Sequence, residues 1–281
     1  MFSQISILGV GLLGASLAMA VRKHCCASTI NVWARKKTTL DRCAEEVWCD
    51  QVFEDVQESV RGSNLIIICT PVDSISGLMA DISSHLNEGA IVTDVGSVKE
   101  NICTSSREIF KNSKGVFIGA HPMAGSEKSG LENAQCNLFE GKTCVVTPDE
   151  FTCLDALGKL KDFWRKLNMD VHEFSASEHD RAVAYFSHLP HIISSALSES
   201  LLAQPIKWRN VSGNGLKDTT RIAAGDPRLW EQICMMNSEN LVLAIENTEK
   251  SLAKVKKSIQ SKNNEDLFSF LKDGSKFRKS I

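Results

Sequence analysis

A chain of 281 residues with 43% hydrophobic and 23% charged side chains is long enough for two globular domains. Its 32 basic and 34 acidic residues leave a net charge of −2, which gives no electrostatic reason to expect nucleic acid or an anionic membrane as a partner. Ten cysteines are scattered without a CxxC pair, so zinc-ribbon and redox-dithiol sites have no support. Reduced thiols, no export signal and no apolar stretch of membrane-spanning length predict a cytoplasmic protein.

Short apolar runs alternate with amphipathic segments through the first part of the chain. The runs typical of strands lie at 4–8, 29–33, 64–70, 90–94, 116–120, 143–147 and 170–174. Helical patterns fit between most of them, at 15–23, 36–46, 74–86, 99–111 and 151–167. This alternation predicts an α/β domain with a parallel sheet and right-handed crossovers.

The pattern changes near residue 175, after which long helical segments replace the strands, at 179–203, 228–258 and 263–272. We therefore expect an α/β domain over residues 1–175 and an all-helical domain over residues 176–281. Long helices with an exposed apolar face are often covered by a second copy of the chain, so we expect a homodimer formed through the helical domain.

A glycine pattern follows the first predicted strand directly. Residues 9–14 read GVGLLG, in which Gly9 permits a tight turn, Gly11 lets the backbone approach a pyrophosphate and Gly14 permits close packing of helix on strand. The pattern alone is weak, but here it follows a strand and opens a helix, as in a Rossmann-type dinucleotide-binding domain. We predict cofactor contacts from the turn and the helix start at Gly9, Gly11, Leu12, Leu13 and Gly14.

The residues after the second predicted strand bear on the choice between NAD and NADP. An acidic residue there would bind the ribose 2′-hydroxyl of NAD, but this chain reads Ala34-Arg35-Lys36-Lys37, with no carboxylate before Asp41. Arg35 and Lys36 are suited to pairing with a 2′-phosphate, although they could instead be a solvated helix start. NADP is the preferred prediction, and NAD remains an alternative.

Four segments combine polar residues and glycines beside apolar runs. They are TDVGSVK at 93–99, GAHPMAGSE at 119–127, SHLPH at 187–191 and GLKDTTR at 215–221. The first two follow predicted strands, where ligands bind in open α/β sheets. These segments are the candidate sites of chemistry.

With these motifs the chain resembles the prephenate/arogenate dehydrogenase family. TDVGSVK, GAHPMAGSEKSG, SHLPH and GLKDTTRIAAGDPRLW occur in the family's order and spacing, together with GVGLLG and Thr70-Pro71-Val72. The most specific of these motifs is HPxAGxExSG. The resemblance covers nearly the whole chain and implies oxidative decarboxylation of a cyclohexadienyl substrate, with hydride transfer to a nicotinamide and loss of CO₂.

The resemblance also implies roles for single residues. His121 matches the catalytic histidine, whose neutral imidazole would accept the proton of the ring hydroxyl. Ser97 matches the serine that orients this histidine and contacts substrate and nicotinamide. Arg221 matches the arginine that binds a substrate carboxylate, with Lys217 as electrostatic support and Asp218 as an orienting partner.

Further contacts complete the predicted site. His191 is expected to face the substrate, whereas His188 and Trp230 are equally compatible with structural roles. The other predicted substrate contacts are Ser187, Gly125 and Ser126. The other predicted cofactor contacts are Thr70, Pro71, Val72 and Asp94.

Several alternatives bear on this interpretation. Arogenate in place of prephenate is the main one, and His191 tilts the choice weakly toward prephenate. A β-hydroxyacid dehydrogenase would need a helical lysine near Asn237 to Asn240, but none occurs before Lys250. A zinc site built from His121, His188 and His191 lacks an HExxH pattern, so no metal is predicted. An NADP-binding sensor without catalysis would need neither His121 nor Arg221.

Overall fold

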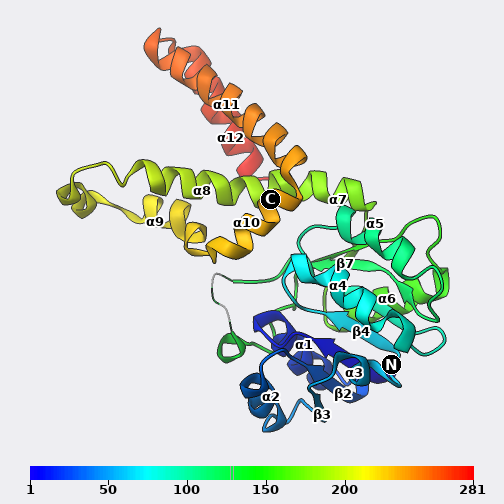
Figure 1. Ribbon diagram of the computed structural model, residues 1–281. Helices are drawn as coiled ribbons and strands as arrows, with labels where there is room; N and C mark the ends of the chain where they lie inside the picture. Colours follow the sequence, from blue (N-terminus) through cyan, green and yellow to red (C-terminus); the bar gives the residue numbers. More distant parts are fainter. Residues whose placement is uncertain (127, 129) are drawn as a thin grey trace. The chain divides into compact units, whose positions relative to one another are not determined.

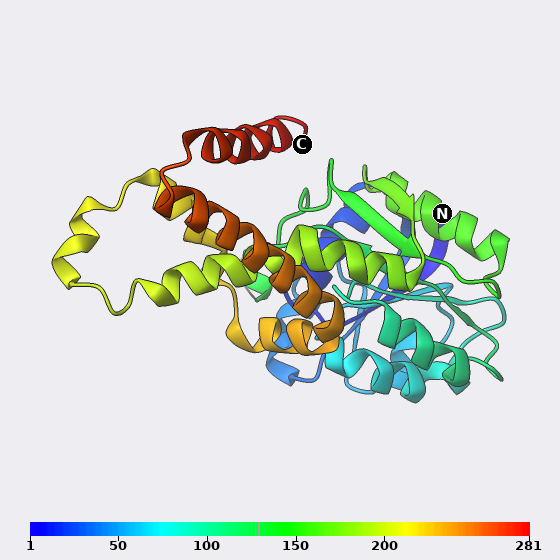
Figure 2. The same cartoon turned by 90° about the horizontal axis from the view of Figure 1, so that it is seen from above.

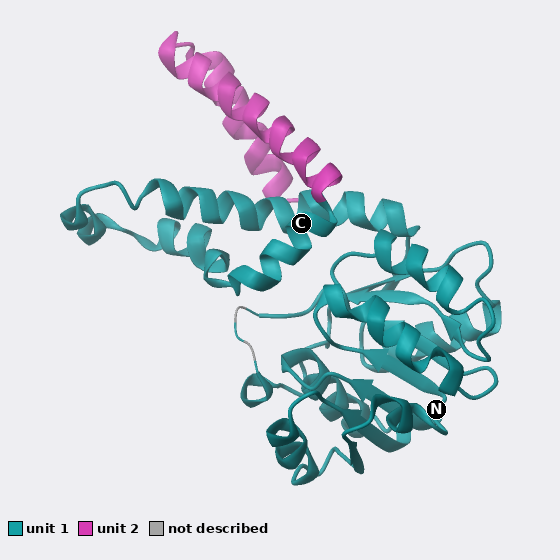
Figure 3. Ribbon diagram, viewed as in Figure 1, with its two compact units in different colours: residues 1–237 teal, residues 238–281 magenta. Residues whose placement is uncertain are grey.

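The computed structural model describes residues 1–126, 128 and 130–281, which form two compact units, residues 1–237 and 238–281 (Figure 3). The described strands all belong to the first unit, together with the helices up to Met236. The second unit consists of the last two helices. No helix in the described residues has both the length and the apolar character needed to cross a membrane.

A six-stranded parallel sheet forms the centre of the first unit (Figure 1). Its strand order, β3-β2-β1-β4-β5-β6, is the doubly wound order in which ligands bind where the connections reverse direction, here between β1 and β4. The register places Ile5 beside Ile30 on one side and Leu65 on the other. The strands are β1 (Phe2–Leu8), β2 (Ala27–Trp33), β3 (Gln51–Phe53), β4 (Leu65–Ile68), β5 (Ile91–Asp94) and β6 (Val116–Phe117).

The central strands are apolar along their whole length because helices cover both faces of the sheet. Ile5 and Ile7 pack with Leu17 of α1 in one cluster, while Leu8 and Ile68 belong to a second cluster with residues of α4. A strand buried on both faces reads as a continuous apolar run, as 64–70 does. The helices of this region are α1 (Leu12–Lys23), α2 (Lys37–Ala44), α3 (Val56–Val60), α4 (Val72–Ile82), η1 (Ser83–His85) and α5 (Glu100–Ile109).

The expected strand 116–120 is divided between two sheets. Val116–Phe117 is β6 of the parallel sheet, whereas Gly119–Pro122 is β7 and pairs antiparallel with β8 (Thr143–Thr147). β9 (Asp170–Glu173) pairs parallel with β8, which completes a three-stranded second sheet. The expectation of one parallel sheet is therefore wrong for these three strands, because an apolar run does not show where the chain changes partner. η2 (Leu131–Asn133) and α6 (Leu154–Lys166) complete this region.

Helices follow β9, as expected. They are α7 (Ala176–Val183), a π-helical turn η3 (Ala184–His188), α8 (Leu189–Ser200), η4 (Ile206–Val211), α9 (Asn214–Thr220), η5 (Arg221–Ala224) and α10 (Pro227–Met236). The expected continuous helix 228–258 is wrong, since α10 ends at Met236. Asn237 leaves the helical conformation with φ −116°, and its buried amide binds Asp180 and His188 instead.

The helix α10 packs both on α8 and on the sheet region. Figures 1 and 2 show α10 alongside α8, and Ile233 of α10 joins the apolar cluster of Val72 and Ile75. At the same surface the Gln232 Nε2 donates to Asp73 Oδ2 over 2.7 Å. These contacts explain why the first compact unit continues to Asn237. The second unit holds α11 (Ser238–Gln260) and α12 (Asn264–Arg278), which contact each other.

Candidate active site

The glycine turn between β1 and α1 has the geometry of a nucleotide cradle. Gly9 adopts φ +98°, and a Cβ at this position would lie 2.7 Å from Thr70 Cγ2 at the end of β4. A Cβ on Gly14 would lie 2.0 Å from the Gly9 carbonyl oxygen, so only glycine lets α1 pack this closely. A Cβ on Gly11 would meet nothing within 4 Å, because this side of the turn is open.

The open side coincides with the start of α1. Gly11 is the N-cap without a side-chain cap, so the first amides of the helix, at Leu12 and Leu13, can bind phosphate. Pro71 and Val72 begin α4 across the switch point between β1 and β4. The residues present therefore fit the pyrophosphate of a dinucleotide.

The basic segment after β2 lies at the same edge of the sheet. Ala34 is buried, whereas Arg35 and Lys36 are exposed, and within the described chain their side chains have no hydrogen bond or ion pair. The next cation, Lys37, is paired with Glu54 over 3.1 Å. Two cations are thus available at the end of β2 where a ribose would lie.

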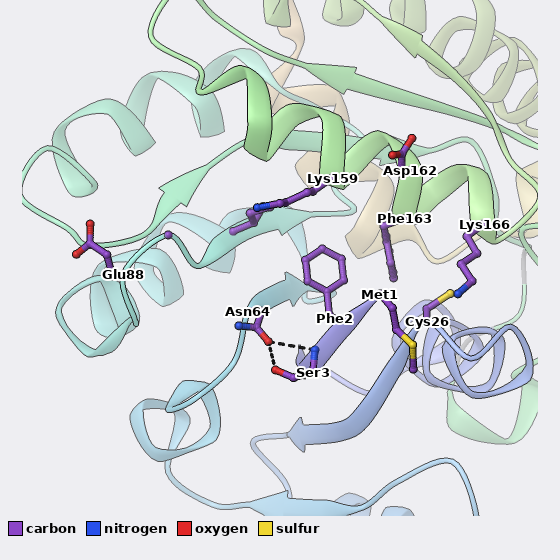
Figure 4. Close-up of a pocket in the computed structure, with 12 residues that line it drawn as sticks. Met1, Phe2, Ser3, Cys26, Asn64, Glu88, Lys159, Asp162, Phe163 and Lys166 are labelled. Atoms are coloured by element: carbon purple, nitrogen blue, oxygen red, sulfur yellow. Dashed lines mark hydrogen bonds between the residues drawn. The ribbon is translucent and has the colours of Figure 1, made fainter.

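A pocket of about 630 Å³ lies at the opposite edge of the sheet (Figure 4). Its walls come from the starts of the strands, with Phe2 and Asn64, and from Lys159 and Lys166 of α6. Phe2 meets Phe163 edge to face at its floor. Ligands of doubly wound sheets bind at the carboxyl ends of the strands, so this pocket is not the cofactor site.

The candidate catalytic histidine, His121, is the third residue of β7, where its side chain is buried. Its Nδ1 lies 2.8 Å from Nε2 of His179 on α7, and Nδ1 of His179 lies 2.7 Å from Oδ1 of Asp180. The same carboxylate accepts the backbone N–H groups of Lys99 and Glu100 over 2.7 and 2.9 Å. It thereby caps the start of α5 from another helix.

The chain of hydrogen bonds determines which nitrogen of each imidazole carries a hydrogen. A carboxylate only accepts, so Nδ1 of His179 carries a hydrogen and Nε2 of His179 accepts one. Nδ1 of His121 must then donate, which leaves the Nε2 of His121 with a lone pair. His121 is thus prepared as a hydrogen-bond acceptor or base.

Burial keeps these imidazoles neutral. Desolvation, together with the neighbouring His179, Lys99 and His188, holds the pKa of His121 well below its usual value. Desolvation likewise lowers the pKa of His179, even though Asp180 acts in the opposite direction. Desolvation lowers the pKa of His188 to about 4. A neutral imidazole at position 121 is the form that accepts a proton.

A second cluster gathers around Trp230 of α10. The ring of His191 stacks on Trp230 with centroids 3.6 Å apart, and the ring of His188 meets the same indole edge to face at 6.1 Å. Gly225 closes this cluster, because a Cβ there would lie 2.7 Å from the Trp230 Nε1. Nδ1 of His191 is buried without a hydrogen-bond partner in the described chain. An unpaired polar atom of this kind is suited to a bound ligand.

The predicted cationic residues lie in short helices beside the cluster around Trp230. Lys217 of α9 and Arg221 of η5 are both exposed, and α9 and η5 pack against α8, the helix of His191. Lys217 belongs to α9, and Arg221 begins η5 directly after that helix. Ser187 belongs to the π-helical turn that ends at His188 and is half-buried.

The loop after β7 completes the predicted set. Gly125 and Ser126 are exposed, and the Ser126 hydroxyl accepts from the Lys128 N–H over 3.0 Å. Glu127 and Ser129 of the same motif lie outside the described residues. Across the described ranges, no three histidine, cysteine or acidic side chains group so that they could hold a metal ion.

Asp94, unlike the open turn at Gly11, lies wholly inside the protein. Its carboxylate is wholly buried and receives the Lys99 ammonium, the Gly96 N–H at 2.8 Å and the Ala120 N–H at 3.2 Å. The half-buried Ser97 follows Gly96 directly, and His121 follows Ala120. The two predicted catalytic residues are therefore linked through one carboxylate.

Sequence reasoning missed several polar residues that build this site. His179 and Asp180 lie inside an amphipathic helical pattern, and their partners are 58 and 81 residues away in the chain. Asn237, whose Nδ2 lies 2.8 Å from the Asp180 carbonyl oxygen, fell within an expected helix. The adjacent His-Asp pair was the only local signal, and such pairs are common on helix surfaces.

Comparison with known proteins places the chain in a family. Residues 17–173 match the family model described as the prephenate dehydrogenase nucleotide-binding domain, and residues 175–273 match the prephenate dehydrogenase dimerization domain. A cyclohexadienyl dehydrogenase of Zymomonas mobilis is 29% identical over 284 residues, which cover 100% of this chain and 96% of the relative.

Two solved structures agree with this assignment. Prephenate dehydrogenase of Aquifex aeolicus, in complex with hydroxyphenyl propionate and NAD+, is 31% identical with a TM-score of 0.92, covering 100% of this chain and 99% of its own. Arogenate dehydrogenase of Synechocystis is 28% identical with a TM-score of 0.85 and 99% coverage of both chains. The expected fold class, a nucleotide-binding α/β domain followed by a helical domain, is confirmed. The chain belongs to the prephenate dehydrogenase family of nicotinamide-dependent oxidoreductases.

Proposed function

We propose that this protein catalyses the NADP-dependent oxidative decarboxylation of prephenate to 4-hydroxyphenylpyruvate and CO₂. The observation that carries the proposal is the buried chain from Asp180 through His179 to His121, which leaves Nε2 of His121 as a proton acceptor. Both the family membership and the nucleotide cradle at Gly9 to Gly14 support the same reaction class.

In the proposed reaction, His121 accepts the proton of the ring hydroxyl at its Nε2. The bound nicotinamide supplies the acceptor for the hydride that leaves the ring carbon bearing that hydroxyl. Ser97 donates a hydrogen bond that holds the hydroxyl in line with the imidazole. Loss of the ring carboxylate as CO₂ then makes the ring aromatic as a phenolate, which takes the proton back from His121. The protein therefore has to orient one proton transfer and bind the carboxylates of the substrate.

The substrate would be bound beside Trp230. In this proposal Arg221 holds a carboxylate, Lys217 adds positive charge from the preceding turn, and His191 hydrogen-bonds the side chain of the substrate. The buried, unpaired Nδ1 of His191 supports the last role. Ser187, Gly125 and Ser126 complete the proposed substrate contacts.

The proposed cofactor is NADP, with Arg35 and Lys36 on the 2′-phosphate. The support is their exposure and lack of partners, together with a small Ala34 where an acid would repel phosphate. The Aquifex relative was solved with NAD+, so NAD is the alternative that the experiment has to separate. The pyrophosphate would bind at the glycine turn and the start of α1, at Gly9, Gly11, Leu12, Leu13 and Gly14. The nicotinamide side of the site would be bordered by the ends of two strands and the start of α4, at Thr70, Pro71, Val72 and Asp94.

We also propose a homodimer that uses the helical part, with the domains divided at residues 175 and 176. The match of residues 175–273 to a dimerization domain supports both statements. In the second unit large apolar side chains are exposed, among them Leu243, Leu252 and Phe268. Each of the ten cysteines is a free thiol, which suits the proposed cytoplasmic location. Sedimentation at the 30.9 kDa of one chain would contradict the dimer.

The decisive experiment measures kcat/KM for prephenate and arogenate, each with NAD and with NADP, by absorbance of the reduced nicotinamide. We expect the highest value for prephenate with NADP. A higher value for arogenate would make arogenate, not prephenate, the substrate. The likeness to the Synechocystis arogenate dehydrogenase is the reason for including arogenate. Turnover of only 3-hydroxy acids would overturn the proposal, and cofactor binding without any turnover would favour a sensor.

A substitution of His121 tests its proposed role as the base directly. His121→Asn should lower kcat by about 100-fold or more while cofactor affinity stays near wild type, because a general base contributes roughly 10²- to 10⁴-fold. Arg221→Gln should mainly raise KM. Near-wild-type kinetics in both variants would show that the assigned roles are wrong.

A further inference from the structure

A fully buried ion pair lies behind the proposed catalytic residues and takes no part in the reaction described above. Lys99 and Asp94 have no exposed surface, and the ammonium of Lys99 contacts Oδ2 of Asp94. Transferring two charges out of water is costly, and an apolar pair of similar volume is often as stable or more stable. The pair therefore calls for a role other than stability.

The Asp94 carboxylate connects two segments that carry reactive side chains. Oδ2 accepts the Gly96 N–H, one residue before Ser97, and Oδ1 accepts the Ala120 N–H, one residue before His121. The first segment follows a strand of the parallel sheet, and the second is a strand of the three-stranded sheet. One carboxylate thus joins the two sheets at the point where Ser97 and His121 must face the same hydroxyl.

Lys99 connects the same carboxylate to the histidine chain. Its side chain binds Asp94, while its backbone N–H donates to Oδ1 of Asp180, the residue that binds His179. The stem of Lys99 passes β7 closely, because a Cβ on Gly119 would lie 3.3 Å from its Cδ. A Cβ on Gly96 would likewise lie 2.8 Å from Oδ2 of Asp94. Glycines at 96 and 119 leave the space that the ion pair occupies.

We infer that Asp94 and Lys99 are positioning residues of this active site, which set Ser97 and His121 relative to each other. The inference rests on the proposed function. The charged and titratable groups that face His121 are Lys99, His179, His188 and, behind them, the carboxylates of Asp94 and Asp180. Among them Lys99 and the two histidines lower the pKa of His121, after desolvation.

The test removes both charges together, so that neither is left buried and unpaired. The double variant Asp94→Asn/Lys99→Met should lose roughly 10- to 100-fold in kcat, since small misplacements of reacting groups cost this much. Lys99, but not the Asp94 carboxylate, is among the groups that shift the pKa of His121, so removing the pair should make protonation of His121 easier and move the acidic limb of the kcat/KM profile to higher pH. Lys99→Arg keeps the charge and should leave that limb in place.

A matched control is the partly exposed ion pair of Lys161 on α6 and Glu173 on β9. Lys161→Met/Glu173→Gln should change neither kcat nor the pH profile. If the buried double variant does not fold, Gly96→Ala provides the second test, because it displaces the Asp94 carboxylate without removing a charge. It should lower kcat with an unmoved acidic limb.

Two results would overturn the inference. One is wild-type kcat in the double variant with an unmoved pH profile, and the other is wild-type kcat in Gly96→Ala. Failure of the proposed function has a different signature, namely a wild-type protein that binds NADP or NAD but turns over neither prephenate nor arogenate. The two failures are therefore distinguishable.

Discussion

The rings of His121 and His179 meet edge to face, with Nδ1 of the first 2.8 Å from Nε2 of the second. The two residues come from different elements, β7 and α7. Because Asp180 fixes the tautomer of His179, it also fixes which nitrogen of His121 can accept a proton. The proposed base is therefore oriented by a histidine and a carboxylate, the arrangement by which a third group orients a catalytic base.

The first prediction concerns His179. His179→Leu keeps a side chain of similar size but removes both ring nitrogens, so His121 loses its orienting partner. We expect kcat to fall by about 10- to 100-fold, less than the full contribution of a general base, with KM and cofactor affinity little changed. Steady-state kinetics and a cofactor titration check this.

The matched control is His172→Leu. His172 is exposed on β9, where it pairs with Asp170 over 2.8 Å, and Val145 of β8 separates it from His121 in the sheet register. It should behave as wild type. A kcat within about twofold of wild type for His179→Leu would mean that His121 needs no such partner.

The second prediction concerns the stack of His191 on Trp230. In Gly225→Ala the new methyl group would lie 2.7 Å from the Trp230 Nε1 and 3.3 Å from the His191 Cε1, so the stack has to shift. Overpacking costs about 1–3 kcal/mol. If that cost falls on the substrate-binding conformation, KM for prephenate should rise by roughly tenfold.

Gly158→Ala on α6 is the control, since a Cβ there meets nothing within 4 Å. It should leave KM unchanged and stabilise the helix slightly, by about 0.5–1 kcal/mol. An unchanged KM in Gly225→Ala would remove the Trp230 stack from the substrate site.

The third prediction is a loss of stability in acid. The pKa of His188 is lowered by burial from 6.5 to about 4, so between these values the unfolded chain takes up a proton that the folded chain does not. The contribution of His188 to the free energy of unfolding should therefore be fully present above pH 6.5 and should be lost as the pH falls toward 4. His188 alone accounts for about 3 kcal/mol, at roughly 1.4 kcal/mol per pKa unit.

Urea unfolding at several pH values between 7 and 4 measures this slope. In His188→Gln the slope should be shallower, because one buried neutral histidine is gone. An equal slope in His188→Gln and wild type would show that protonation of His188 does not drive the acid transition.

The sequence predicted those parts of the fold that depend on local pattern. Strand β1, the turn at Gly9 to Gly14 and the buried strand β4 lie where apolar runs and glycines placed them. The three-residue β3 and the short α3 escaped detection because neither has a long enough periodic pattern. The divided run at 116–120 shows the same limit, because pairing partners are chosen by tertiary packing.

The site divides in the same way. Motif resemblance pointed to His121, Ser97 and Arg221, but it gave no role to Lys99 and did not include His179. Their roles depend on contacts between elements far apart in the chain, as the 2.7 Å bond from the Lys99 backbone N–H to Asp180 illustrates. A charged residue within a helical pattern reads as a solvated surface, and only the packed structure shows that it is buried.

The last prediction concerns the cofactor. In Arg35→Ala the proposed partner of the 2′-phosphate is lost, while the glycine turn that would bind the pyrophosphate is untouched. Hydrogen bonds to charged groups contribute about 1.5–3 kcal/mol, so the Kd for NADP should rise by roughly 10- to 100-fold and the Kd for NAD should stay the same.

Lys37→Ala is the matched control, because Lys37 already pairs with Glu54. Titration by quenching of tryptophan fluorescence measures both constants. An equal loss for NAD and NADP would mean that Arg35 does not read the 2′-phosphate, and tighter binding of NAD by the wild-type protein would exclude the NADP preference altogether.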